Sequence, residues 1–235
     1  MSKINIKKYF GINVVRDDLL EGGTKSILLP NLIDLDENEY VYASPVYGGF
    51  QIALSIYCKI NNIKCTIFCA KRKIKHINTI ECINNGANVV EIRNGYLSVV
   101  EKRAREYCRE NGAKKIKFGA NTVENKILIA NRMKKVIALL GKEPDEIWCA
   151  VGSGTLLEGI LLGTENAEIN GVIVGKEYKN NNPRIKRLIK YPKDFDKESK
   201  FSAPFPSMPN YDLKAFEYCY KYSGLVKDTL FWNVL

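Results

Sequence analysis

The sequence predicts an α/β fold with mainly parallel sheets. Short β-rich runs alternate with helical segments from about residue 40 to residue 176, and parallel sheets with helical crossovers produce this pattern. The run at residues 147–151 is continuously apolar, as expected of a strand that is buried on both faces. The length of 235 residues is sufficient for one large domain or two small ones, each with its own hydrophobic core.

Each predicted element has its own local signal. Short runs of β-branched, aromatic and other apolar residues predict strands at residues 40–45, 64–70, 88–92, 116–119, 146–152 and 169–176. Apolar residues that recur at helical spacing predict helices between them, at residues 49–62, 76–87, 97–112, 123–142 and 156–163. Gly86 and Gly141 stand where two of these helices should end, because glycine readily adopts the backbone conformation of a helix C-terminus.

The charge balance is basic, with 36 Lys and Arg against 26 Asp and Glu and a formal net charge of +10. These basic residues are spread over several segments without a nucleic-acid-binding motif, which predicts a solvated basic surface, with a nucleic acid or other polyanion as the alternative partner. No apolar run approaches the roughly 20 residues that a membrane span needs. The N-terminus also lacks a secretory signal. We therefore expect a cytoplasmic protein without a membrane partner.

The cysteine and histidine counts restrict the chemistry. Seven cysteines, an odd number, without an export signal indicate reduced thiols. Cys65 and Cys69 share one face of a predicted strand, where we interpret them as small buried apolar residues. The one histidine, His76, follows a basic run at a predicted solvated helix start. A Ser-His-Asp triad, a Cys-His pair or a histidine-rich metal site would all need this residue, so we expect none of these and no metal.

Two glycine-rich turns lie between a predicted strand and a predicted helix, at residues 44–51 and 152–155. In open α/β folds, ligands bind beyond the carboxyl ends of strands, where helix N-termini present backbone N–H groups. The second turn is the better candidate for an anion cradle, because its two glycines permit close approach and its two hydroxyls can donate hydrogen bonds. Its residues are Gly152, Ser153, Gly154 and Thr155. Such a short motif also occurs in purely structural turns.

Lys25 stands after two glycines and a threonine, at the start of an apolar run that is helix-like. An amine that is desolvated in an apolar pocket becomes a competent nucleophile toward an aldehyde. Taken alone, however, a lysine after a loop is more simply interpreted as a surface residue.

Five segments taken in order give a more specific indication. The segments RDDLLEGGTK, SPVYGGFQIALS, AVGSGTLLEG, PNYDLKA and LFWNV together resemble the fold-type II pyridoxal-phosphate enzymes, the tryptophan synthase β-like group. Within that group the chain is most similar to the 1-aminocyclopropane-1-carboxylate deaminase and D-cysteine desulfhydrase branch, over nearly its whole length. The resemblance implies pyridoxal 5'-phosphate as cofactor and two three-layer αβα domains. Residues 1–40 and 125–235 would form the larger domain, and residues 41–124 the smaller inserted one.

The resemblance also implies roles for single residues. Lys25 would form a Schiff base with the cofactor, and the turn at residues 152–155 would hold its phosphate. Tyr211 would lie near the substrate as a second catalytic residue. Val234 stands where the family has a threonine at the pyridine nitrogen, so we expect Asn233 to take over that contact.

The first glycine-rich turn departs from the family pattern. A serine and an asparagine that contact substrate and cofactor in the family correspond to Gly48 and Gly49 here. We expect the flanking Tyr47 and Gln51 to replace some of the lost hydrogen bonds. The predicted substrate-binding residues are Ser44, Tyr47, Gly48, Gly49 and Gln51.

These resemblances predict a pyridoxal-phosphate-dependent lyase or deaminase that acts on a small amino acid through a Lys25 Schiff base and an α-carbanion. They also imply a homodimer. Two alternatives stay open. One is an enzyme of the same fold whose substrate amine is attached to a larger anion such as a DNA base, for which the net charge of +10 argues. The other is a non-catalytic binding protein that retains the fold.

Overall fold

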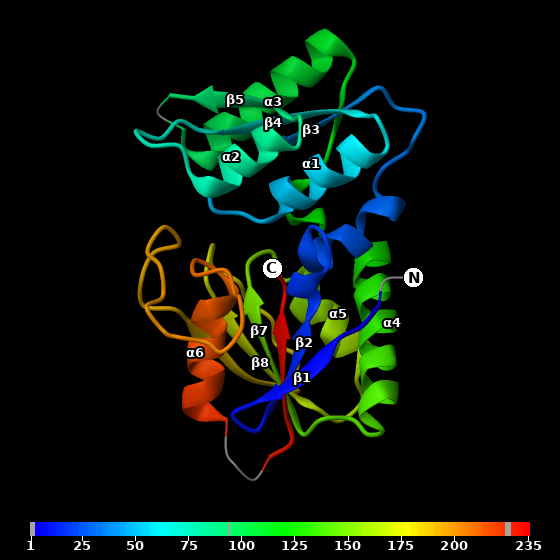
Figure 1. Ribbon diagram of the computed structural model, residues 1–235, viewed down its shortest axis with the longest axis vertical. Coiled ribbons are helices and arrows are strands. Elements are labelled where there is room, and N and C mark those ends of the chain that lie inside the picture. The colour runs from blue at the N-terminus through cyan, green and yellow to red at the C-terminus, as the bar shows by residue number, and fades with distance from the viewer. Residues whose placement is uncertain (1–2, 94, 224–226) are drawn as a thin grey trace. The chain divides into compact units, whose positions relative to one another are not determined.

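The computed structural model describes residues 3–93, 95–223 and 227–235 (Figure 1). The chain forms two compact units, one of Met1–Thr24 with Asn121–Leu235 and one of Lys25–Ala120. These boundaries differ from the expected ones, because residues 25–40 belong to the smaller unit and residues 121–124 to the larger. The chain passes between the units directly before Lys25 and directly after Ala120.

The larger unit contains a six-stranded sheet whose strand order is β1-β2-β10-β7-β8-β9. Only the pair β1–β2 is antiparallel, and all other neighbours in this sheet are parallel. The strands are β1 (Ile6–Tyr9), β2 (Ile12–Arg16), β7 (Glu146–Val151), β8 (Glu168–Ile173), β9 (Ile185–Lys190) and β10 (Thr229–Asn233). Its longer helices are α4 (Val123–Leu140), α5 (Thr155–Gly163) and α6 (Asp212–Tyr222).

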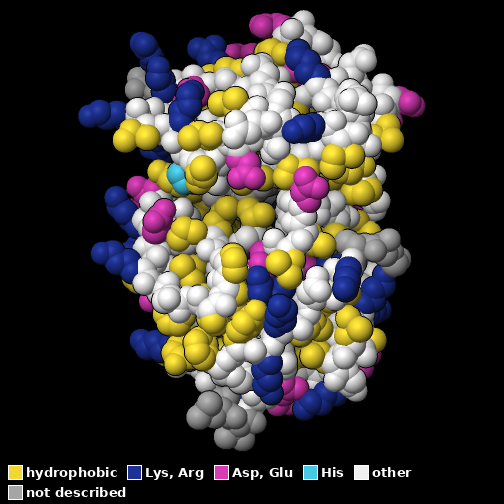
Figure 2. Space-filling model, viewed as in Figure 1, with side chains coloured by type: hydrophobic (Ala, Val, Ile, Leu, Met, Phe, Trp, Pro, Cys, Tyr) yellow, Lys and Arg dark blue, Asp and Glu magenta, His cyan; other side chains and the backbone are white. Residues whose placement is uncertain are grey.

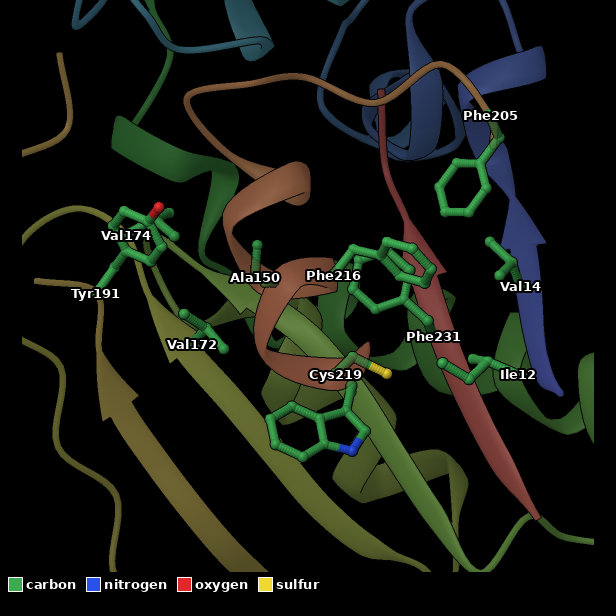
Figure 3. Close-up of a cluster of buried hydrophobic side chains, with 12 residues drawn as sticks. Ile12, Val14, Ala150, Val172, Val174, Tyr191, Phe205, Phe216, Cys219 and Phe231 are labelled. Carbon is green, nitrogen blue, oxygen red and sulfur yellow. The ribbon is translucent and has the colours of Figure 1, made fainter. Parts of the chain in front are cut away.

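Helices cover both faces of this sheet, which makes the unit three-layered. Helix α6 lies on one side, and α5 with α4 packed against it lies on the other (Figure 1). A buried cluster joins α6 to its face of the sheet (Figure 3), with the Phe216 ring centroid 5.0 Å from that of Phe231 and 4.7 Å from that of Phe205. This packing fixes the start of α6, where Tyr211 lies.

The smaller unit contains a four-stranded, fully parallel sheet in the order β5-β4-β3-β6. Helices α1 and α2 pack together on one face, while α3 packs on β3 and β4 around a core that includes Val41, Phe68 and Ala104. The elements are β3 (Glu39–Ala43), β4 (Lys64–Ala70), β5 (Asn88–Ile92), β6 (Lys114–Lys115), α1 (Phe50–Ile60), α2 (Ile77–Asn84) and α3 (Leu97–Asn111).

The α/β class with mainly parallel sheets is confirmed, and β4 and β5 have the predicted bounds. The strand expected at residues 116–119 is wrong. The short strand β6 ends at Lys115. In the turn at Phe118–Ala120, Gly119 adopts a φ of +70°, which no strand permits. The helix-like run after Lys25 forms only short 3-10 turns, Gly23–Ile27 and Leu29–Asn31.

Two further observations concern the whole described chain. No helix in its described part is long and apolar enough to cross a membrane. Six of the seven cysteines are buried, including Cys65 and Cys69 on β4. Burial raises the pKa of the Cys82 thiol to about 12, so this thiol stays protonated and is a poor nucleophile.

Candidate active site

The glycine-rich turn after β7 has the geometry of an anion cradle. Gly154 adopts a φ of +86° and stands at the N-terminus of α5, where a glycine has no side chain to cap the helix N–H groups. The Ser153 Oγ and Thr155 Oγ1 atoms are 2.9 Å apart, and Asn121 Nδ2 donates to the Ser153 carbonyl at 3.0 Å. A helix N-terminus with nearby hydroxyls favours an anionic ligand.

A tyrosine that sequence reasoning missed forms one wall of this turn. A Cβ atom on Gly154 would overlap Cε2 of Tyr178, so only glycine fits beside the ring. The Tyr178 hydroxyl donates to Glu158 Oε1 at 2.8 Å, and Lys126 Nζ pairs with Glu158 Oε2 at 2.6 Å. Burial raises the pKa of the Tyr178 hydroxyl, which therefore stays protonated. The wall is braced by α4 and α5 and should hold its position when a ligand binds.

The structure brings Tyr211 and the cradle together. A Cβ atom on Gly152 would lie 2.9 Å from the Tyr211 hydroxyl and 3.2 Å from Cε2 of its ring. Tyr211 occupies the N-cap position of α6, and its ring centroid is 6.3 Å from that of Phe195. The absence of a side chain at residue 152 is thus what admits the tyrosine hydroxyl to the edge of the cradle.

Asn233 lies at the end of β10 and is fully buried. Its Nδ2 donates to the Pro206 carbonyl at 2.9 Å, and its Oδ1 accepts from the Ser207 hydroxyl at 2.8 Å. Both ends of the amide therefore contact the loop before α6. Its expected contact with the pyridine nitrogen stays a prediction.

Asp212 is a second residue that sequence reasoning missed, although it directly follows the predicted Tyr211. Its carboxyl is fully buried, and Oδ2 accepts from the Leu235 backbone N–H at 3.1 Å. Within the described residues, Oδ1 has no hydrogen-bond partner. Burial raises the pKa of this carboxyl well above its usual range, against the opposing effect of the Leu235 and Val234 backbone N–H groups.

Replacing Asp212 by asparagine should stabilise the protein at neutral pH. Because the folded-state pKa of Asp212 is raised, the folded protein binds its proton more tightly than the unfolded chain does. The loss of folding stability caused by ionising the buried carboxyl is therefore absent below the unfolded pKa of about 4. It grows as the pH rises toward the folded pKa. In urea unfolding, the free energy of unfolding of D212N should increase relative to that of wild type between pH 4 and pH 7. A difference that does not depend on pH would contradict this prediction.

Lys25 lies on the smaller unit, in the 3-10 turn Gly23–Ile27, and is half-buried. Its Nζ donates to the Gly119 carbonyl at 3.4 Å. The Gly119 backbone N–H in turn donates to the hydroxyl of Tyr42 at 3.4 Å, and burial raises the pKa of that hydroxyl. The left-handed conformation of Gly119 thus presents a carbonyl to the lysine amine.

The first glycine-rich turn is held together by Gln51. This buried amide donates from Nε2 to the Val46 and Gly48 carbonyls, both at 2.9 Å. Ser44 Oγ donates within the same turn, to the Pro45 carbonyl at 2.9 Å. The observed contacts of both side chains therefore shape the turn, and their binding of substrate stays a prediction. Gly49 is the N-cap residue of α1, and no side chain caps the backbone N–H groups at the start of this helix.

The Tyr47 ring contacts two groups from the segment after β4. The Arg72 Cζ atom is 5.5 Å from its ring centroid, and the His76 ring centroid is 4.8 Å away. His76 caps α2, with Nδ1 accepting from the Asn78 backbone N–H at 3.2 Å, in agreement with the expected helix start. Asn78 Nδ2 also donates to the Gly48 carbonyl at 3.4 Å, so the first turn of α2 supports the glycine-rich turn.

Comparison with known proteins identifies the family of the chain and solved structures with a similar fold. Residues 28–228 match a family model described as "Pyridoxal-phosphate dependent enzyme". No curated protein matches the sequence. The structure of a homologue of ACC deaminase is 18% identical, with a TM-score of 0.79, 95% of this chain covered and 83% of that one. O-acetylserine dependent cystathionine beta-synthase from Helicobacter pylori is 13% identical, with a TM-score of 0.73 and 99% and 92% covered.

A hydrogen sulfide-producing enzyme from Fusobacterium nucleatum gives a similar result. It is 14% identical, with a TM-score of 0.69, and the superposition covers 97% of this chain and 91% of that one. At these identities the similarity concerns the fold, and the expected fold type is confirmed.

Proposed function

Since the chain belongs to the family of pyridoxal-phosphate-dependent enzymes, we propose that it is a lyase or deaminase acting on a small amino acid, with Lys25 carrying the cofactor. The observation that carries this proposal is the cradle at residues 152–155 with Tyr211 at its edge. A helix N-terminus, two hydroxyls and glycine-only contacts suit the phosphate of this cofactor.

Residues of the larger unit suit two groups of the cofactor, its phosphate and its ring nitrogen. The phosphate suits the N–H groups of α5 with the Ser153 and Thr155 hydroxyls. For the ring nitrogen we propose Asp212, whose fully buried Oδ1 lacks a protein partner in the described part of the chain. A neutral carboxyl with a raised pKa can share a proton with such a nitrogen, whereas the Asn233 amide is engaged with Pro206 and Ser207.

When bound, pyridoxal phosphate supplies an electron sink for the negative charge left at the α-carbon of an amino acid. Lys25 Nζ would hold the cofactor through its aldehyde carbon and, once released, would take and return the α-proton. The Tyr211 hydroxyl would donate a proton to the departing group or hold the substrate. The uncapped N–H groups at the start of α1 suit the substrate carboxylate.

Covalent trapping tests this proposal directly. The purified protein is mixed with pyridoxal phosphate, reduced with borohydride, digested and analysed by mass spectrometry. We expect a pyridoxyl group on Lys25. An unmodified protein, or modification spread over surface lysines such as Lys59, would overturn it.

We further propose that the protein forms a homodimer. Large exposed apolar side chains on α4 and α5, namely Val123, Ile127 and Leu162, favour a partner surface of this kind. Light scattering after size exclusion measures the mass, and a monomer at micromolar concentration would contradict this.

A second candidate function is suggested by the loops after β4 and β5. Both loops lie at the carboxyl edge of the smaller sheet, the edge that also carries the turn at residues 44–49. Lys71, Arg72, Lys73 and Arg93 are exposed there, and of the basic residues in these loops Lys75 forms an ion pair, with Glu91. Basic side chains also gather above the one histidine on the face that Figure 2 shows. These charges favour an amine substrate attached to a larger anion, such as a DNA base.

DNA binding separates this candidate from the first. If it is correct, fluorescence anisotropy will show salt-sensitive binding of an oligonucleotide, and Arg72→Gln will reduce the slope of log affinity against log salt by about 1. Lys59→Gln, an exposed change on α1 in the same unit, is the control. A protein that binds no DNA at low salt would exclude the second candidate.

A further inference from the structure

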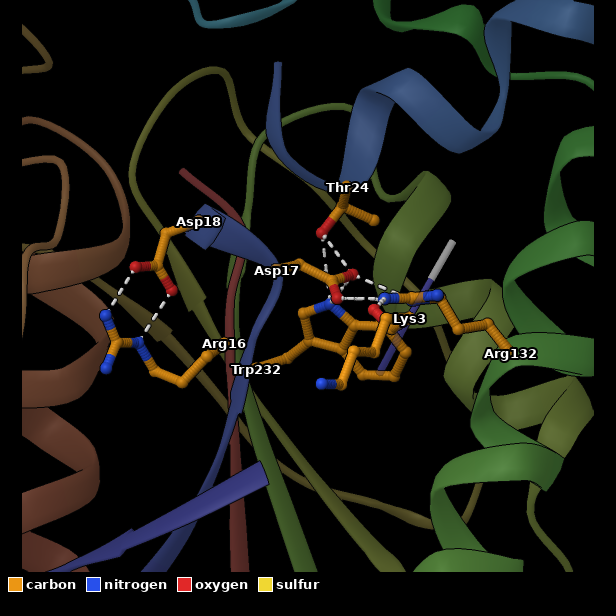
Figure 4. Close-up of polar contacts among 7 residues, drawn as sticks. All are labelled: Lys3, Arg16, Asp17, Asp18, Thr24, Arg132 and Trp232. Atoms are coloured by element: carbon orange, nitrogen blue, oxygen red, sulfur yellow. Dashed lines mark hydrogen bonds and ion pairs between the residues drawn. The ribbon is translucent and has the colours of Figure 1, made fainter. Parts of the chain in front are cut away.

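A buried polar network lies immediately before Lys25 (Figure 4). At its centre is Asp17, which follows β2 and is fully buried. Its Oδ2 accepts from the Thr24 hydroxyl at 3.0 Å and from the Trp232 indole N–H at 3.1 Å. Arg132 of α4 donates to the same carboxylate from Nε, at 3.0 and 3.2 Å, and also from Nη2. Three separate segments of the chain thus meet at one carboxylate.

Thr24 is held in this network by its side chain and by its backbone. Its backbone N–H donates to the Val234 carbonyl at 2.9 Å, and its hydroxyl also accepts from the Trp232 indole at 3.1 Å. Gly23 adopts a φ of +66°, and a Cβ atom there would overlap the Val234 carbonyl oxygen. The segment before Lys25 therefore lies directly on the end of β10, where a side chain at residue 23 would lift it away.

Asp17 has no chemical step of its own to perform in this arrangement. Its carboxylate is engaged by a guanidinium, an indole and a hydroxyl, all of them buried. What it determines is the position of the backbone at Thr24. The next residue is Lys25, and the chain enters the other compact unit at that point.

We propose that Asp17 and Thr24 are positioning residues, which orient the backbone from which Lys25 extends toward the cofactor aldehyde. This inference rests on the proposed function of Lys25. Effective nucleophilic attack needs the reacting atoms at a defined distance and angle, and a displacement of about 1 Å can lower a rate by roughly 10²-fold. The hydrogen bonds that hold Thr24 in the buried network restrict the position of the backbone at Lys25.

The experiment compares three variants of the full chain. Thr24→Val keeps the shape of the side chain but removes the hydroxyl, and Thr24→Ser restores the hydroxyl. Thr229→Val is the matched control, because Thr229 Oγ1 donates to the buried carboxylate of Glu146 at 2.9 Å at the other end of the same strand, β10. Borohydride trapping after timed exposure to pyridoxal phosphate measures how fast Lys25 is modified.

We expect T24V to slow the modification of Lys25 roughly 10- to 100-fold, T24S to recover most of the wild-type rate, and T229V to lose stability without slowing it. The proposal would be overturned if Lys25 in T24V were modified at the wild-type rate or if T229V slowed the modification as much as T24V does. It would also be overturned if T24S did not recover the rate.

A second readout keeps this inference separate from the proposed function. The protein without cofactor is labelled with trinitrobenzenesulfonate, and the labelling of Lys25 is measured relative to exposed Lys59 in the same digest. The ratio should change in T24V and stay at the wild-type value in T229V. If wild type never accepts pyridoxal phosphate, the proposed function fails, and an unchanged ratio in T24V would still overturn the positioning role.

Discussion

Replacing Lys25 by alanine should abolish cofactor attachment and lower the rate of amino acid turnover by roughly 10³-fold or more, because the covalent link and the proton-transferring amine are lost together. Trapping with borohydride and an assay of the released product measure the two effects. The fold should persist, because Lys25 is half-buried in a short turn and the Gly119 carbonyl that it contacts lies 3.4 Å away.

Lys214 is the matched control for this prediction. It is fully buried, and its Nζ donates to the Asp194 carbonyl at 2.9 Å and lies 5.0 Å from the ring centroid of Tyr191. Burial lowers the pKa of this amine. Lys214→Met should cost about 1–3 kcal/mol of stability, because the Asp194 carbonyl loses the lysine as its donor. It should still be modified at Lys25. Modification of K25A at the wild-type rate would contradict the assignment.

Replacing Arg132 by methionine should cause a large loss of stability in the larger unit. The change leaves the Asp17 carboxylate buried without its cation, and breaking a buried ion pair in this way typically costs about 3–5 kcal/mol. Arg132 also donates to the Lys3 carbonyl at 3.5 Å, so the N-terminal segment loses a contact as well. Urea unfolding followed by circular dichroism measures the free energy of unfolding.

Two controls show whether the cost comes from the buried charge. The double variant Asp17→Asn/Arg132→Met removes both charges and should recover much of the loss, which a double-mutant cycle quantifies. Lys179→Met breaks an exposed ion pair with Glu177 and should cost less than about 1 kcal/mol. Equal losses in R132M and K179M would show that burial does not set the cost.

The strands that the sequence predicts well are those whose signal is local. Apart from Thr66, strand β4 is apolar after its first residue. Strand β5 is rich in valine and isoleucine, and both strands have the predicted bounds. Strand β9, Ile185–Lys190, is not predicted, because its charged residues suit the partly exposed edge of a sheet. Local sequence does not specify that position. Strand β6 is only two residues long, and its pairing depends on β3 rather than on its own composition.

In the candidate site, too, the features with a local sequence signal are predicted, and those that depend on tertiary packing are not. Glycines between a strand and a helix identify the turn at residues 152–155 because their backbone requirement is local. The approach of Tyr211 to Gly152 and the isolation of the Asp212 Oδ1 atom depend on how α6 packs on the sheet. No periodicity in the sequence encodes these distances. The role of Asp17 likewise depends on segments that meet only in the folded protein.

The place of β10 in the larger sheet has a consequence for biosynthesis. Among the strands in the described residues it is the last to be synthesised, yet it lies between β2 and β7 and pairs with both. Until it is made, the facing edges of β2 and β7 stay open, and open edges of this kind recruit other chains. The nascent chain should therefore be prone to pair with other chains until residues 229–233 have emerged, and only then can the Trp232 indole reach the Asp17 carboxylate.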